Sequence, residues 1–149
     1  MAEQACDNAK EKVHGKRENP VEEGWMDFHY IHNGIGGELS SIRERQGTDT
    51  CMARPWLIAG GDSKDGRKYD RLTELHDLFS RYGVSRSDIK TIGSECENSL
   101  QCGRQELIRI YGHHKGLEEE TKAVYPEEEQ LLKVLYDMSE VYDLWFKEG

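Results

Sequence analysis

The most regular pattern of apolar and polar positions lies near the C-terminal end of the chain. Its apolar residues recur at steps of three and four: Leu131, Leu135, Met138, Tyr142 and Trp145. Residues at these steps share one face of an α-helix. Pro126 suits the first helical position, and the glutamates at 127–129 suit the first turn, where the helix dipole favours anions. The pattern predicts a long amphipathic helix with an apolar stripe and an acidic back.

The same spacing recurs earlier in the chain. It predicts helices over about residues 35–46, 68–82 and 98–112. Ser85 or Ser87 can cap a further short helix, because a serine oxygen accepts a hydrogen bond from a free backbone amide at a helix start. With the C-terminal helix, this makes about five helices and a mainly α fold.

Two short apolar runs, 25–31 and 55–59, are candidates for a minor strand pair, although the first also fits helical spacing. Residues 117–124 suggest a short turn. Residues 1–20 are polar and carry balanced charges, which favours a flexible N-terminal tail. We therefore expect a tail followed by a single compact helical domain over 21–149.

The apolar positions of these elements define an expected core. It comprises Phe28, Ile31, Leu39, Ile42, Trp56, Leu57, Leu72, Leu75, Phe79, Ile89, Ile92, Leu107, Ile108, Leu131, Leu135, Met138, Tyr142 and Trp145. A chain of 149 residues fits one domain and can bury enough surface to fold without disulfide bonds.

Charge is unevenly distributed along the chain. Residues 116–149 hold ten acidic residues and three lysines, which gives −7 of the total net charge of −9, whereas residues 61–115 have a net charge of +1. We expect the acidic C-terminal helix to lie across the basic middle of the chain. The net charge disfavours direct nucleic-acid binding and attraction to anionic membranes, and no apolar run is long enough to span a bilayer.

The four cysteines, Cys6, Cys51, Cys96 and Cys102, are spaced irregularly. Residues 1–18 lack the apolar stretch of a secretory signal. We therefore expect reduced thiols and a cytoplasmic protein.

One cluster of residues has the chemistry of a metal site. Asp27, His29 and His32 stand close together, and histidines three positions apart share a helix face. Imidazoles suit zinc, and a carboxylate can bind the metal or orient a histidine. The alternative is ordinary surface or hydrogen-bonded histidines, since the spacing matches no standard zinc finger.

The glycine-rich segments carry weaker signals. Residues 60–66 lack the pattern of a phosphate-binding or calcium-binding loop, and residues 34–37 lack the last glycine of a dinucleotide-binding turn. Cysteine–histidine pairs occur without any local sign of an activated thiol. The chain is therefore more consistent with a non-enzymatic protein, and we expect no cofactor unless zinc binds the cluster above.

The leading hypothesis is a protein-binding or inhibitory module that presents an acidic surface to a basic protein partner. The expected partner-binding residues are Glu118, Glu119, Glu120, Glu127, Glu128, Glu129, Trp145 and Phe146. One alternative is a zinc-stabilised or metal-dependent enzyme using Asp27, His29 and His32. Another is a regulator that imitates nucleic acid with its carboxylates or touches it through the basic middle of the chain.

Overall fold

The computed structural model describes residues 3–7, 9, 24–29, 38–46, 51–59 and 68–146, and the structural statements below concern these residues. In chain order the elements are β1 (Gly24–Met26), α2 (Leu39–Gln46), β2 (Trp56–Ala59), α3 (Tyr69–Arg81), α4 (Arg86–Asn98), α5 (Leu100–His113), α6 (Leu117–Val124) and α7 (Glu128–Trp145). This confirms a mainly α fold in one compact domain with a minor strand pair.

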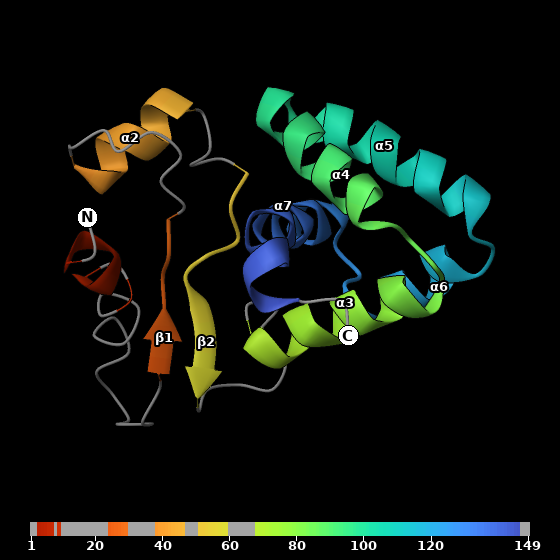
Figure 1. The fold of residues 1–149 in the computed structure, drawn as a ribbon, viewed down its shortest axis with the longest axis horizontal. Helices are drawn as coiled ribbons and strands as arrows, with labels where there is room; N and C mark the ends of the chain where they lie inside the picture. The colour runs from red at the N-terminus through yellow and green to blue at the C-terminus, as the bar shows by residue number, and fades with distance from the viewer. Residues whose placement is uncertain are drawn as a thin grey trace.

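Helix α7 lies in the middle of the molecule (Figure 1). Helices α3, α4 and α5 contact it, α6 packs on α3, and the strands with α2 lie on the remaining side. From Leu131 to Tyr142, every residue of α7 except Lys133 and Glu140 is buried. A helix buried on nearly all sides is a core helix. The acidic back expected along its whole length is therefore wrong for its middle, where Asp137 is fully buried.

Local sequence signals explain several helix ends. After α3, the chain turns at Gly83, whose φ of 76° is a conformation that favours glycine. The Ser85 hydroxyl then accepts a hydrogen bond from the backbone amide of Asp88, and the Asp88 carboxylate bonds back to Ser85. This reciprocal capping box starts α4. Helix α5 begins with a one-way cap, in which the Ser99 hydroxyl accepts a hydrogen bond from the backbone amide of Cys102.

Other boundaries differ from the predictions. Residues 117–124 form a helix rather than a short turn, α5 continues one residue beyond Gly112, and α7 begins two residues after Pro126. The glycine-rich segments 34–37 and 60–66 lie outside the described residues. Residues 3–7 of the expected tail are helical, and Ala5 and Ala9 are buried; the remainder of 1–20 is not described.

The strand pair is antiparallel and shorter than predicted. Trp25 pairs with Leu57, and Met26 pairs with Trp56. Strand β1 stops before Phe28, whose carbonyl oxygen accepts hydrogen bonds from the guanidinium groups of Arg43 and Arg54. That oxygen therefore accepts hydrogen bonds from side chains rather than from the backbone of a neighbouring strand.

Most of the expected core is buried, but Ile108 was assigned wrongly because its side chain is 54% exposed. The buried face of α5 runs through Gly103, Leu107 and Ile110. Because glycine contributes no apolar side chain, the hydrophobic pattern of α5 does not mark Gly103 as part of the buried face. Phe28 is partly buried against the core. Ile31 and the side chains of Leu39, Ile42 and Trp145 lie outside the description.

None of the four cysteines takes part in a disulfide bond. Burial raises the pKa of Cys51 to about 12 and that of Cys96 to about 11. The thiolate is the reactive form of cysteine, so a thiol-specific reagent at pH 8 should label exposed Cys6 first. The labelling rates of Cys51 and Cys96 should be at least about a hundredfold lower than that of Cys6. Peptide mass mapping of labelled sites measures this order, and unfolding in urea provides the control. Equal labelling of Cys6 and Cys96 in the native protein would contradict the packing.

Candidate functional site

A buried ion pair joins the segment before β2 to the central helix α7. The backbone amide of Arg54 donates to Asp137 Oδ2 at 2.8 Å, and its Nε donates to Asp137 Oδ1 at 2.9 Å. Both side chains are 0% exposed. Trp56 Nε1 also donates to Asp137 Oδ2 at 2.9 Å. Three donors thus converge on one carboxylate, which satisfies a charge that would otherwise be costly to bury.

The network extends outward from Arg54. Its Nη1 donates to the Phe28 carbonyl oxygen at 2.8 Å, its guanidinium carbon lies 4.2 Å from the centroid of the Phe28 ring, and its Nη2 is paired with Glu140. Burial opposes the charged form of Arg54, but Asp137 and Glu140 more than offset it and raise the pKa of Arg54 above its ordinary value. The guanidinium is therefore a permanent cation that ties the strand region to α7.

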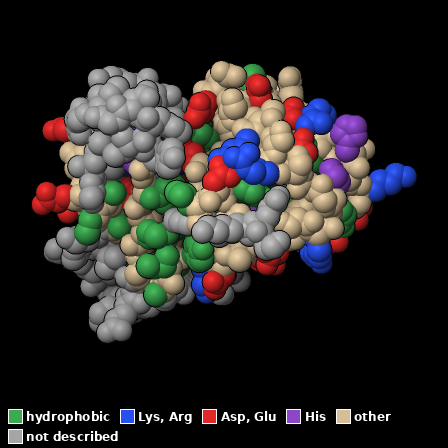
Figure 2. Space-filling model, in the orientation of Figure 1, with side chains coloured by type: hydrophobic (Ala, Val, Ile, Leu, Met, Phe, Trp, Pro, Cys, Tyr) green, Lys and Arg blue, Asp and Glu red, His purple; other side chains and the backbone are tan. Residues whose placement is uncertain are grey.

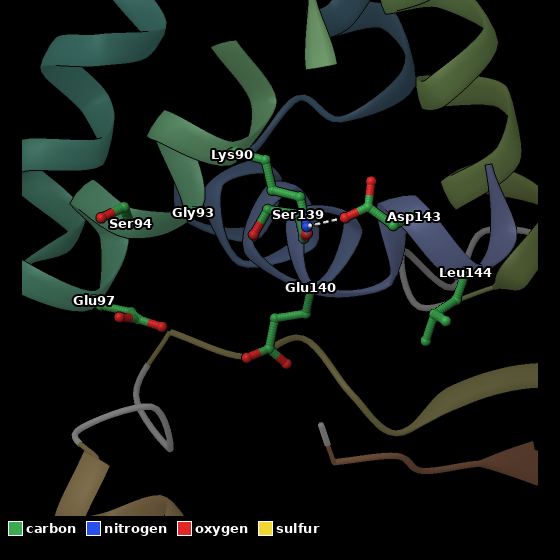
Figure 3. Close-up of a pocket in the computed structure, with 8 residues that line it drawn as sticks. All are labelled: Lys90, Gly93, Ser94, Glu97, Ser139, Glu140, Asp143 and Leu144. Carbon is green, nitrogen blue, oxygen red and sulfur yellow. Dashed lines mark hydrogen bonds and ion pairs between the residues drawn. The ribbon is translucent and has the colours of Figure 1, made fainter. Parts of the chain in front are cut away.

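Glu140 belongs both to this network and to the lining of a cleft between α4 and α7. The cleft has a volume of about 360 Å³ and is lined by Lys90, Gly93, Ser94, Glu97, Ser139, Glu140, Asp143 and Leu144. Figure 3 shows the side chains of Glu97 and Glu140 reaching toward each other from the two helices. Ligand pockets are typically about 300–1,000 Å³, so this cleft has room for one side chain or a very small molecule.

The two facing carboxylates share one hydroxyl group. Tyr136 donates to Glu140 Oε1 at 2.8 Å and lies 3.3 Å from Glu97 Oε1. Burial, followed by the charge of Glu140, raises the pKa of Tyr136 above its ordinary value, so the hydroxyl keeps its proton. The hydroxyl has one proton for two acceptors, and its shorter contact is with Glu140, so the exposed Glu97 carboxylate has the weaker bond within the protein.

The other end of the cleft is neutralised within the protein. Lys90 Nζ donates to the Ser139 carbonyl oxygen at 2.6 Å and lies 3.3 Å from Asp143 Oδ2. Arg86 Nη2 donates to Asp143 Oδ2 at 2.7 Å. Lys90 and Arg86 therefore compensate Asp143, whereas the excess negative charge of the cleft lies at Glu97 and Glu140.

The Asp143 contacts predict a pH effect. The hydrogen bond from Arg86, followed by those of Lys90, lowers the pKa of Asp143 to about 2 from an ordinary 3.8. Because the folded-state pKa is depressed, the contribution of this carboxylate to stability is present above pH 3.8 and is lost as pH falls through about 2. NMR titration of the side-chain carboxyl should show the low pKa in wild type and a rise toward 3.8 in Arg86→Gln. Arg81→Gln is the control and should leave it unchanged; an unshifted value in wild type would contradict the pairing.

The six glutamates predicted as partner-binding are all exposed. Four of them lie near a cation: Glu118 near Lys122, Glu120 near Arg81, Glu128 near Arg104, and Glu129 near Lys133. Acidic and basic side chains are accordingly interspersed on the face shown in Figure 2. The acidic surface is therefore less one-sided than the linear charge count indicates.

The acidic C-terminal helix contacts the basic middle of the chain, as predicted, because Arg104 pairs with Glu128 and Arg86 pairs with Asp143 on α7. Arg81 pairs with Glu120 on the preceding helix, α6. Several acidic side chains of the C-terminal part are therefore paired with basic side chains of the same molecule. These pairs engage Arg81, Arg86 and Arg104, three arginines of the basic middle that the nucleic-acid alternative would need.

Of the two aromatic residues predicted to bind a partner, Phe146 packs against the core. The Phe146 side chain is only 9% exposed and stacks on the His76 ring with a centroid distance of 4.0 Å. It closes the core rather than presenting an outer face. The side chain of Trp145 lies outside the described residues.

The proposed metal-binding residues are not assembled in the part of the chain that the structure describes. Arg43 donates to both carboxylate oxygens of Asp27, at 2.8 and 3.0 Å. His29 is half-buried, and burial, with Arg43 adding to it, lowers its pKa. His32 is not described. Within the described ranges, no three His, Cys, Asp or Glu side chains are grouped to hold a metal ion, and the zinc alternative stays a prediction.

Sequence reasoning missed Arg54, Asp137 and the facing carboxylates of the cleft. One signal was present: Asp137 interrupts a run of apolar residues in the C-terminal helix. A carboxylate on a buried face requires a cation or several donors nearby, although its partner, 83 residues away, has no signature in the sequence.

Comparison with known proteins gives no relative. No protein-family model matches the chain, and no curated protein or solved structure is significantly similar to it. Among the described helices, none is both long and apolar enough to cross a membrane.

Proposed function

We propose that this protein is a non-enzymatic binding module that presents exposed carboxylates to a basic protein partner. The observation that carries the proposal is the exposure of all six glutamates at the starts of α6 and α7, at 118–120 and 127–129. Glu118, Glu119 and Glu120 fill the first turn of α6, directly after its N-cap, Gly116, so three carboxylates stand together at one exposed helix end.

The ion pairs around these glutamates are exposed enough for a partner's basic side chains to replace the cations in them. The side chains of Arg81 and Glu120 are 69% and 48% exposed, and those of Lys122 and Glu118 are 58% and 50% exposed. Pairs this exposed typically contribute only about 0–1 kcal/mol. A partner's lysines and arginines can therefore replace them at little cost, and such an interface gains mainly in association rate and selectivity.

Quantitative affinity capture tests the proposal. Wild-type protein is compared with a variant in which Glu118, Glu119 and Glu120 are changed to Gln, and with a second in which Glu127, Glu128 and Glu129 are changed to Gln. The matched control is Asp70→Asn, Glu74→Gln and Asp77→Asn, which removes the same three charges from exposed positions on α3. Basic partners should be lost from the test variants and retained by the control, and the difference between wild type and the test variants should shrink at high salt, because salt screens exposed charges. Retention of every partner by both test variants would overturn the proposal.

A further inference from the structure

The cleft between α4 and α7 has two chemically different parts along one face of α7. Glu140 and Leu144 are four residues apart and therefore lie one helical turn from each other on the same side. Leu144 is 56% exposed, although most large apolar residues of the helix are buried. A carboxylate and an exposed aliphatic side chain thus line the same cleft at a spacing of one helical turn.

Three oxygen atoms meet at the acidic part, two from carboxylates that line the cleft and one from the buried Tyr136 side chain. They come from Glu97 on α4 and from Tyr136 and Glu140 on α7, and the Tyr136 oxygen lies within 3.3 Å of both carboxylates. Arg54 compensates Glu140 from the buried side, but it is shared with Asp137. In the described residues, the Glu97 carboxylate has only the Tyr136 hydroxyl as a partner. Glu97 is exposed, so the acidic part presents a net negative charge to the solvent side of the cleft.

This arrangement fits an ammonium group better than a guanidinium group. An ammonium is a compact charge with three donors, whereas a guanidinium favours a planar, two-bond contact with a single carboxylate. The aliphatic stem of a lysine can lie along Leu144 while its charged end reaches the carboxylates. Gly93, which lies against Ser139, has no side chain to fill the cleft between the two helices.

We propose that the cleft between α4 and α7 receives a lysine side chain of the protein partner, with the ammonium group between Glu97 and Glu140 and the stem along Leu144. This inference rests on the proposed function, because it gives the basic partner a specific anchor beside the more general attraction of the exposed glutamates. The cleft then supplies register and selectivity for one lysine among several basic residues.

NMR titration of the full chain with short capped peptides tests the cleft. A peptide with one central lysine should shift backbone amide signals within residues 90–97 and 139–144 in a saturable way. The matched peptide with norleucine, which keeps the aliphatic stem and lacks the ammonium, should not. Glu97→Gln should weaken lysine-peptide binding by about three- to tenfold, while Glu74→Gln, the same charge change on α3 outside the cleft, should leave it unchanged.

Several outcomes would overturn the cleft inference. These are equal binding of the norleucine peptide, signal changes confined to residues 118–129, no effect of Glu97→Gln, and n-butylamine binding as tightly as the peptide, which would mark a site for free amines. If the lysine peptide fails while capture still depends on the glutamates at 118–120 and 127–129, only the cleft inference falls. If the peptide binds in the cleft while those glutamates prove dispensable for capture, only the proposed function falls.

Discussion

Asp137→Ala is expected to lower the free energy of unfolding by about 3–5 kcal/mol. The substitution removes the acceptor of Arg54 and of the Trp56 indole, and both Arg54 and Asp137 side chains are fully buried. Glu140 stays beside Arg54 but cannot accept the backbone and Nε donors that Asp137 serves. An unpaired cation and orphaned donors inside a protein cost far more than a surface contact. Urea denaturation followed by circular dichroism measures the loss, which is a large part of a typical total of about 5–15 kcal/mol.

Asp143→Ala is the matched control, because Asp143 is also an aspartate of α7 with two cationic neighbours. Its side chain is 49% exposed, so the loss should be small compared with that of Asp137→Ala, because solvent screens exposed ion pairs. Asp137→Asn separates charge from shape, because it keeps the size of the side chain and removes the charge. If Asp137→Ala costs no more than Asp143→Ala, the Arg54 network is not the main link between the strand region and α7.

The helices could be predicted because their signals are local. Ser85 and Gly83 act on backbone groups within a few residues, so their roles follow from sequence alone. The stripe of Leu131, Leu135 and Met138 likewise predicts a helix with a buried face. It does not predict that the opposite face is buried too, because that depends on the elements that pack around α7, and most of them lie far away in the sequence.

The candidate site was harder to predict because its contacts are long-range. Asp27 stands next to histidines in sequence, which suggested a metal site, yet its carboxylate is taken by Arg43, 16 residues away. Glu97 and Glu140 come from different helices and meet only through Tyr136. The sequence predicts that the basic middle of the chain faces the acidic C-terminal helix. It does not predict which basic side chain pairs with which acidic one.

Gly93→Ala is expected to destabilise the protein by about 1–3 kcal/mol, because it overpacks the contact between α4 and α7. A Cβ atom at residue 93 would lie 1.9 Å from Ser139 Oγ and 2.5 Å from Ser139 Cβ. Rotation can move the hydroxyl oxygen away, but the Cβ of Ser139 is fixed to the backbone, so the two helices must separate. That separation would also strain the bond from Lys90 to the Ser139 carbonyl oxygen. The midpoint of urea unfolding measures the effect.

Gly112→Ala is the matched control, since no atom lies within 4 Å of the added Cβ in α5. It should stabilise the protein by about 0.5–1 kcal/mol, because alanine favours a helix more than glycine does. The two substitutions therefore should have opposite signs although the chemical change is identical. Combining Gly93→Ala with Ser139→Gly removes the clashing side chain, so the double variant should lose less stability than the sum of the two single changes. A stabilising Gly93→Ala, or strict additivity in this cycle, would contradict the close approach of α4 and α7 that forms the floor of the cleft.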